Sequence, residues 1–121
     1  MAAGNKSEKK IAIDQERFLG DFAALAEFGA TPGGLNREAG SEAFRAARDF
    51  LEARMRASGL ETRVDAAGNL FGVLRGRGKA ERKILSGSHL DSVTNGGVYD
   101  GPLGIVSALE AVRALCDAGY E

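Results

Sequence analysis

The sequence predicts an α/β fold in which helices cover a small sheet, and three observations lead to this prediction. Two segments have the residue spacing of amphipathic helices, and two short apolar segments face each other across a glycine turn. A further apolar segment leads through a glycine-rich loop into a last helix. Both kinds of element in one short chain are typical of a layered α/β structure. The length of 121 residues suits a single domain.

The first element is predicted to be a helix that begins after Asp14, a suitable N-cap residue. Residues 1–13 before it are mostly polar and charged, which is typical of a disordered tail. The helix then carries an apolar stripe at helical spacing, formed by Phe18, Phe22 and Leu25. Residues 29–41 contain Pro32 and several glycines and are predicted to be a loop.

A second helix is predicted between Ser41, a suitable N-cap, and Gly59, which suits the left-handed position after a helix end. Its core-facing side is formed by Phe44, Ala47, Leu51, Met55 and Ser58. Two strands are predicted next. Residues 60–65 alternate between apolar and polar, residues 69–75 are mostly apolar, and the turn between them favours an antiparallel pair.

The last strand and the last helix flank a glycine-rich loop. Ile84 and Leu85 are predicted to open a strand that runs into the sequence GSHLD, and residues 92–101 form the loop. Pro102 suits the first turn of a helix that continues to about residue 118. We expect one face of this helix to pack on the strand, namely Ile105, Leu109, Val112 and Cys116.

Composition excludes several classes of function. The formal net charge is −1 and no cluster of Lys and Arg stands out, so nucleic acid is not an expected partner. No apolar segment approaches the ~20 residues of a membrane helix, and no secretory leader is recognisable. A single cysteine forms no internal disulfide. The expectation is a soluble, cytoplasmic protein.

The residues that carry chemistry lie between positions 86 and 104. His89, the only histidine, lies where the predicted strand ends, the usual place of ligand sites in open sheets. Asp91 is two residues later and therefore on the same side of an extended backbone. Asp100 ends the glycine loop just before the helix. Alone, each has an ordinary explanation: a packed histidine, a turn residue and a partner of the helix dipole.

In combination the three residues suit a metal site. A metal-bound imidazole needs a partner on its second nitrogen, which fixes the tautomer and the ring orientation. A pair of metal ions about 3.5–4 Å apart needs a carboxylate that bridges them. Glycines around Asp100 leave room for the backbone to bring that carboxylate in.

The segment GSHLDSVTNGGVYDGPLG closely resembles the signature of the hydantoinase/carbamoylase branch of the aminoacylase and carboxypeptidase-like two-metal hydrolases. This branch includes N-carbamoyl-L-amino acid hydrolases, allantoate amidohydrolases and β-ureidopropionases. The upstream segment SEAFRAARDFLEARMRASGLETRVDAAGNLFGVLRG resembles the same enzymes, so the resemblance covers residues 14–121. It implies the N-terminal portion of a three-layer sheet-and-helix catalytic domain.

The resemblance also implies roles for the three residues. His89 corresponds to a ligand of one metal, Asp100 to the carboxylate that bridges two divalent ions (Zn, Mn or Co), and Asp91 to the catalytic-site acid that orients the histidine. Peptidase relatives have a longer insertion between the two aspartates, whereas here eight residues separate them, as in the carbamoylase branch. The implied reaction is hydrolysis of a non-peptide C–N bond in a small ureido or carbamoyl substrate.

Part of the family pattern is absent. A Glu pair, which supplies the general base and a metal ligand, and later histidines have no counterpart after Asp100, because Glu110 falls in the buried helix pattern and Glu121 is terminal. The dimerisation domain is absent too. We therefore expect this chain to be an N-terminal fragment, inactive alone, of a parent enzyme that forms a homodimer.

Other classes of function fit less well. An aminoacylase or dipeptidase is disfavoured by the short spacing, whereas a non-catalytic truncated product is compatible with the missing ligands. A phosphate-binding loop is disfavoured because neither GxxxxGK[ST] nor a GxGxxG after a strand is present. A serine hydrolase is disfavoured because no GxSxG is present and only one histidine is available.

Overall fold

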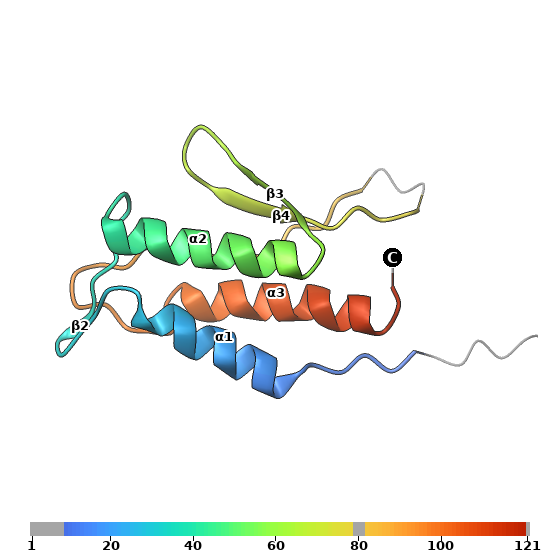
Figure 1. Cartoon of the computed structure of the whole chain (residues 1–121), viewed down its shortest axis with the longest axis horizontal. Helices are drawn as coiled ribbons and strands as arrows, with labels where there is room; N and C mark the ends of the chain where they lie inside the picture. Colours follow the sequence, from blue (N-terminus) through green and yellow to red (C-terminus); the bar gives the residue numbers. More distant parts are fainter. Residues whose placement is uncertain (1–8, 79–81, 121) are drawn as a thin grey trace, which may run out of the picture.

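The structure is a computed structural model that describes residues 9–78 and 82–120. In this part of the chain three helices lie side by side, with a β-hairpin against one of them (Figure 1). Helix α1 (Gln15–Glu27) runs opposite in direction to α2 (Glu42–Ala57) and α3 (Pro102–Asp117). Strands β3 (Glu61–Val64) and β4 (Leu70–Val73) form the antiparallel hairpin that packs on α2.

The helices begin where the sequence predicts. The Asp14 carboxylate accepts from the Arg17 amide, and the Ser41 hydroxyl accepts from the Phe44 amide, so both N-caps are confirmed. Pro102 stands in the first turn of α3, and Gly59 follows α2 with a φ of 82°. These are local effects, because each cap satisfies backbone groups of its own first or last turn.

The core lies between the three helices. It consists of the buried side chains Leu25, Ala47, Leu51, Ile105 and Val106. Phe18 and Phe22 pack against it from α1, which confirms the predicted stripe. Burial of such apolar surface is the main stabilising contribution to the fold.

Two expectations about strands were wrong. Residues 29–41 are not a simple loop, because β1 (Ala30–Thr31) and β2 (Gly34–Leu35) form a small antiparallel hairpin. Residues 82–93 contain no strand, and the side chains of Ile84 and Leu85 are 96% and 84% exposed. A strand needs a neighbour for its backbone groups, and this segment pairs with none of the described strands.

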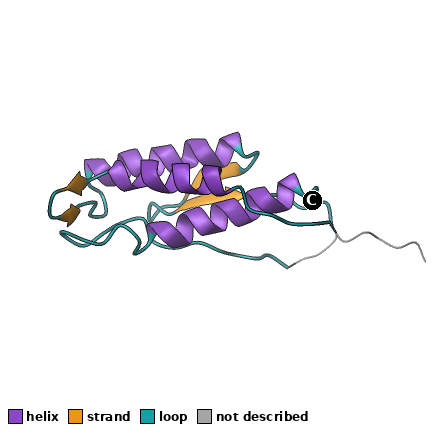
Figure 2. Ribbon diagram, turned by 90° about the horizontal axis from the view of Figure 1, so that it is seen from below, coloured by secondary structure: helices purple, strands orange, loops and turns teal. Residues whose placement is uncertain are grey.

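Helix α3 accordingly packs on α1 and not on a strand at residues 84–85. The two sheets of the described residues have two strands each, and the β3–β4 hairpin lies against the helical layer (Figure 2). The mixture of helix and strand is confirmed, but a layered central sheet is not formed by residues 9–78 and 82–120.

Most of the predicted tail, residues 1–8, lies outside the described residues, as does Glu121. Residues 9–13 have no regular structure, and the Lys9 ammonium donates to the Gly119 carbonyl at 2.7 Å. No helix in the described ranges is long and apolar enough to span a membrane.

Candidate metal centre

The three predicted site residues converge at the N-terminal end of α3. His89, Asp91 and Asp100 line a small open pocket of about 90 Å³, together with the loop that joins them. The predicted closeness of His89 and Asp100 is confirmed, because His89 Nε2 lies 3.1 Å from Asp100 Oδ1. Their assignment as metal ligands stays a prediction.

Each ring nitrogen of His89 faces an oxygen. Nδ1 lies 2.9 Å from the Asp91 carbonyl oxygen and 3.4 Å from Asp91 Oδ1. Both oxygens only accept, so a doubly protonated ring satisfies both contacts, whereas a neutral ring donates to one of them. A neutral ring with its proton on Nδ1, at the shorter of the two contacts, presents the Nε2 lone pair toward the Asp100 carboxylate. The position between Nε2 and Oδ1 therefore suits a proton or another cation.

The surroundings of His89 favour its charged form. The hydrogen bond to the Asp91 carbonyl, and after it the bond to Asp100, raise the pKa of the imidazole above its usual value. Burial acts in the opposite direction but is smaller, since half of the side chain is exposed. A divalent cation between Nε2 and Asp100 Oδ1 would gain from the negative charge of the same Asp100 carboxylate.

Two glycines let the histidine segment lie directly against the start of α3. Gly101 has a φ of 92°, and a Cβ there would lie 2.3 Å from the His89 carbonyl oxygen and 2.8 Å from its ring. A Cβ at Gly104 would lie 2.8 Å from the Ser88 Cβ. Gly101 and Gly104 thus serve close approach, as the sequence indicates, whereas a Cβ at Gly97 would meet nothing within 4 Å.

The β1–β2 hairpin holds the other side of the loop. Leu35 and Gly96 exchange two backbone hydrogen bonds of 2.8 Å. The Asn36 side chain accepts from the Asn95 amide, where Asn95 has a φ of 52°. Asn tolerates this left-handed conformation better than most residues.

Tyr99 attaches the end of the loop to α1. Its ring stacks on Phe22 with centroids 5.3 Å apart and planes 12° from parallel. The neighbouring Asp100 side chain is left 86% exposed, so its second oxygen is available.

Sequence reasoning missed Arg37. It lies in the segment that was expected to be a loop, yet its side chain is fully buried. Its guanidinium donates to the carbonyl oxygens of Leu25, Phe28 and Leu90. A lone arginine after a glycine-rich stretch gives no periodic signal that would reveal such burial.

The described residues supply only part of a metal shell. No three His, Cys, Asp or Glu side chains in residues 9–78 and 82–120 are arranged to hold a metal ion. Glu110 is not near the site, as expected; it is buried in α3 and bonded to the Arg17 guanidinium at 2.8 Å. Arg17 lowers the pKa of Glu110 through these hydrogen bonds.

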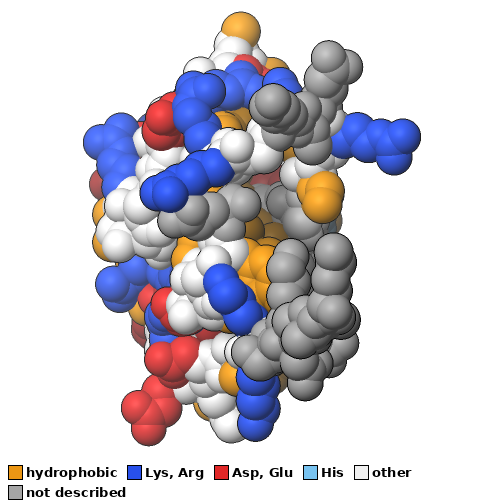
Figure 3. Space-filling model, turned by 90° about the vertical axis from the view of Figure 1, so that its right-hand side faces the viewer, with side chains coloured by type: hydrophobic (Ala, Val, Ile, Leu, Met, Phe, Trp, Pro, Cys, Tyr) orange, Lys and Arg blue, Asp and Glu red, His pale blue; other side chains and the backbone are white. Residues whose placement is uncertain are grey.

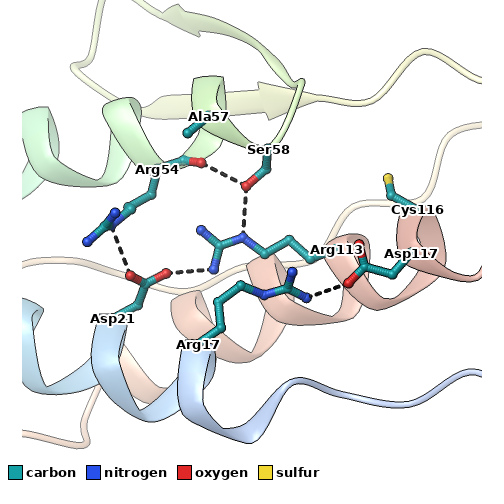
Figure 4. Close-up of a pocket in the computed structure, with 8 residues that line it drawn as sticks. All are labelled: Arg17, Asp21, Arg54, Ala57, Ser58, Arg113, Cys116 and Asp117. Atoms are coloured by element: carbon teal, nitrogen blue, oxygen red, sulfur yellow. Dashed lines mark hydrogen bonds and ion pairs between the residues drawn. The ribbon is translucent and has the colours of Figure 1, made fainter.

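A larger pocket of about 380 Å³ lies elsewhere, between the C-terminal ends of α2 and α3 and the start of α1 (Figure 4). The Asp21 carboxylate forms ion pairs with the guanidinium groups of Arg113, at 2.6 Å, and Arg54, at 2.9 Å. Arg113 also donates a hydrogen bond to the Ser58 hydroxyl. Figure 3 shows this end of the molecule, with Lys and Arg side chains spread over the face, most acidic side chains toward the lower left, and hydrophobic side chains exposed in the middle. The charges of the pocket are already paired, which is typical of a structural ion network.

Curated proteins resemble this chain over most of its length. No family profile matches the chain. It is 41% identical over 108 residues to an N-carbamoyl-L-amino acid amidohydrolase of Geobacillus stearothermophilus, covering 88% of this chain and 26% of the relative. It is 45% identical over 92 residues to an allantoate amidohydrolase of Escherichia coli K12, covering 75% of this chain and 22% of the relative.

A solved structure shows the same likeness in three dimensions. A hydantoinase/carbamoylase family amidase from Burkholderia ambifaria superposes with a TM-score of 0.85 at 41% identity, covering 90% of this chain and 27% of that one. The chain spans about a quarter of the length of the curated relatives that it matches. By sequence and by fold it is therefore related to the hydantoinase/carbamoylase amidases, and it corresponds to about a quarter of such a protein.

Proposed function

We propose that this chain contributes part of the metal site of an amidohydrolase that cleaves a non-peptide C–N bond. The substrate class is a small ureido or carbamoyl compound, such as an N-carbamoyl-L-amino acid, allantoate or ureidopropionate. The observation that carries the proposal is the approach of His89 Nε2 to Asp100 Oδ1 at 3.1 Å within a segment of this sequence signature. The names of the relatives favour ureido substrates over those of aminoacylases or dipeptidases.

The donor set fits a divalent metal ion. Two ligands held at about 2.0–2.1 Å from a tetrahedral zinc lie about 3.3 Å from each other, close to the observed 3.1 Å. His89 would be a ligand of one ion, and Asp100 would bridge two ions of Zn, Mn or Co. When bound, the metal pair polarises a substrate carbonyl and lowers the pKa of a water molecule.

Residues of this chain orient the His89 ring for such a ligand role. A proton on His89 Nδ1, donated to the Asp91 carbonyl, would leave Nε2 with the free lone pair that a metal needs. The Asp91 carboxylate, at 3.4 Å from Nδ1, adds negative charge on the same side of the ring. Such a partner makes an imidazole a better ligand.

The general base and the remaining ligands would have to come from residues beyond those described. We therefore predict that the 121-residue chain does not hydrolyse N-carbamoyl amino acids or allantoate, even with Zn²⁺, Mn²⁺ or Co²⁺ added. A positioned base contributes typically 10²–10⁴-fold to the rate. A three-layer catalytic domain, a homodimer and a cytoplasmic location stay predictions for the whole protein.

Metal binding can be tested on the chain itself, because its single histidine gives one set of imidazole signals in an NMR spectrum. We expect added Zn²⁺ to shift the signals of His89, with weak affinity since few ligands are present. Asp100→Asn should abolish the response, because a neutral amide does not offset the charge of a cation. The control is Asp117→Asn, which removes an exposed carboxylate at the opposite end of α3. An unchanged response in Asp100→Asn would overturn the bridging role.

A further inference from the structure

Arg37 connects three parts of the chain that are distant in sequence. Its Nη1 donates to the carbonyls of Leu25 and Phe28 at 2.8 Å and 3.0 Å, at the end of α1. Its Nε donates to the Leu90 carbonyl at 2.9 Å, one residue after His89. The guanidinium therefore ties the histidine segment to the end of α1.

The backbone of Arg37 holds the same segment at a second point. Its amide donates to the Ser92 hydroxyl at 2.9 Å, and its carbonyl accepts from the Ser92 amide at 3.0 Å. The Ser92 hydroxyl in turn donates to the Leu35 carbonyl at 3.0 Å. Arg37 thus contacts both neighbours of Asp91 in the chain, Leu90 before it and Ser92 after it.

Arg37 occupies a costly position. Its side chain is fully buried, and no carboxylate within the described residues forms an ion pair with it. Burial lowers the pKa of the guanidinium, and Nη2 has no hydrogen-bond partner among the described residues. A buried charge without a counter-ion destabilises a fold unless its hydrogen bonds compensate. An apolar side chain of similar size would fill the same space without this cost.

We propose that Arg37 is a positioning residue of the metal centre. By fixing Leu90 and Ser92 it sets the direction of the peptide between them, and this peptide carries the Asp91 carbonyl that accepts from His89 Nδ1. Arg37 is not one of the residues that line the pocket, and it acts through its hydrogen bonds to Leu90 and Ser92. The inference rests on the proposed function, since it assigns Arg37 to the same metal site.

The test compares Arg37→Lys with Arg113→Lys in the full 121-residue chain. Arg113 is also buried, at 7% exposure, but it bonds to Asp21 and Ser58, away from the site. Lysine keeps the charge but does not reproduce the spread of donors that a guanidinium offers. Both variants lose stability, which is measured by thermal unfolding, so stability alone does not distinguish them.

The distinguishing readout is the His89 imidazole, followed through its two ¹⁵N signals without metal and then with Zn²⁺. We expect the neutral ring of the unaltered chain and of Arg113→Lys to carry its proton on Nδ1. Arg37→Lys should give a mixture of both tautomers and bind Zn²⁺ about 10–100-fold more weakly, as is typical when an outer partner of a metal ligand is lost.

A single Nδ1-protonated form and unchanged Zn²⁺ affinity in Arg37→Lys would overturn the positioning role. If Arg37→Lys does not fold, Ser92→Ala serves as the second variant. It removes the hydroxyl that accepts from the Arg37 amide and leaves the Arg37 guanidinium buried. It should shift the tautomer balance in the same direction, and a tautomer balance like that of the unaltered chain would refute the proposal. Absence of any Zn²⁺ response in the unaltered chain would instead refute the proposed function. The role of Arg37 would still be tested in that case, because the tautomer balance is measured without metal.

Discussion

Replacement of Gly101 by alanine tests how the start of α3 shapes the histidine site. Gly101 has a φ of 92° and a ψ of −66°, a conformation that residues with a side chain rarely adopt. A Cβ would also lie 2.3 Å from the His89 carbonyl oxygen and 2.8 Å from Nδ1 and Cε1 of its ring. The contact at 2.3 Å is to backbone, so it is not relieved by a side-chain rotation.

The two effects add. A strained backbone conformation costs about 1–3 kcal/mol, and overpacking costs typically about 1–3 kcal/mol more. We therefore expect Gly101→Ala to lower the free energy of unfolding by roughly 2–6 kcal/mol. Alternatively, His89 moves away from the new Cβ, and the loss of stability is then smaller because the overlap is relieved. In the second case the ring no longer places Nε2 against Asp100.

Urea unfolding gives the stability, and the His89 imidazole signals give the ring position. Gly40→Ala is the matched control, because Gly40 has a similar φ of 82° but open space around its Cβ position. Gly101→Ala should be more destabilising than Gly40→Ala by the overlap contribution, or should move the His89 signals where Gly40→Ala does not. Equal stability of the two variants with unmoved His89 signals would refute the close-approach argument.

Three further predictions concern stability and surface. Hydrogen bonds from Arg17 lower the pKa of Glu110, so its contribution to stability is complete above the unfolded pKa of about 4.3 and is lost as the pH falls through the lower folded pKa. Glu110→Gln should therefore flatten the pH dependence of the free energy of unfolding below about pH 4.3, and an unchanged slope would contradict this. Ser41→Ala should cost about 1 kcal/mol in urea unfolding through loss of its cap, and no loss would count against the cap. Ile84 and Leu85 are almost fully exposed, so their joint replacement by serine should reduce binding of a hydrophobic dye, whereas equal fluorescence would place the dye elsewhere.

The helices were predictable because their signals are local. Asp14 and Ser41 accept hydrogen bonds from amides in the first turns of their own helices. Pro102 lies in the first turn of α3, where its missing N–H costs no hydrogen bond. The apolar stripe of α1 repeats at helical spacing and packs on the core. A reader of the sequence needs only a window of a few residues to see each of these features.

The strands were less predictable, because strands depend on partners. The β3–β4 hairpin has both strands and the turn within one short segment, and its pairing was confirmed. Strands β1 and β2 have two residues each, too short for any alternation to be visible. Ile84 and Leu85 have the composition of a strand, but they pair with none of the described strands.

The closeness of the three candidate site residues was predictable, but the contacts that hold them in place were not. His89, Asp91 and Asp100 lie within one segment of recognisable spacing, and the structure brings them together. Arg37 acts on Leu90 across 53 positions of sequence, and nothing in its neighbours indicates this contact. Such contacts arise from tertiary packing and leave no local pattern.

Residues 86–104, which contain the proposed ligands, depend on contacts between their loop at residues 90–96 and residues 29–37. They are therefore poorly suited to being grafted alone into another protein. A synthetic peptide of residues 86–104 would contain every proposed ligand described above but lack Leu35, which exchanges two backbone bonds with Gly96. It would lack the Arg37 donors as well. A protein engineer who wishes to move this half-site into another scaffold should therefore graft two discontinuous pieces, the small hairpin and the loop, and keep the helix that joins to Gly101.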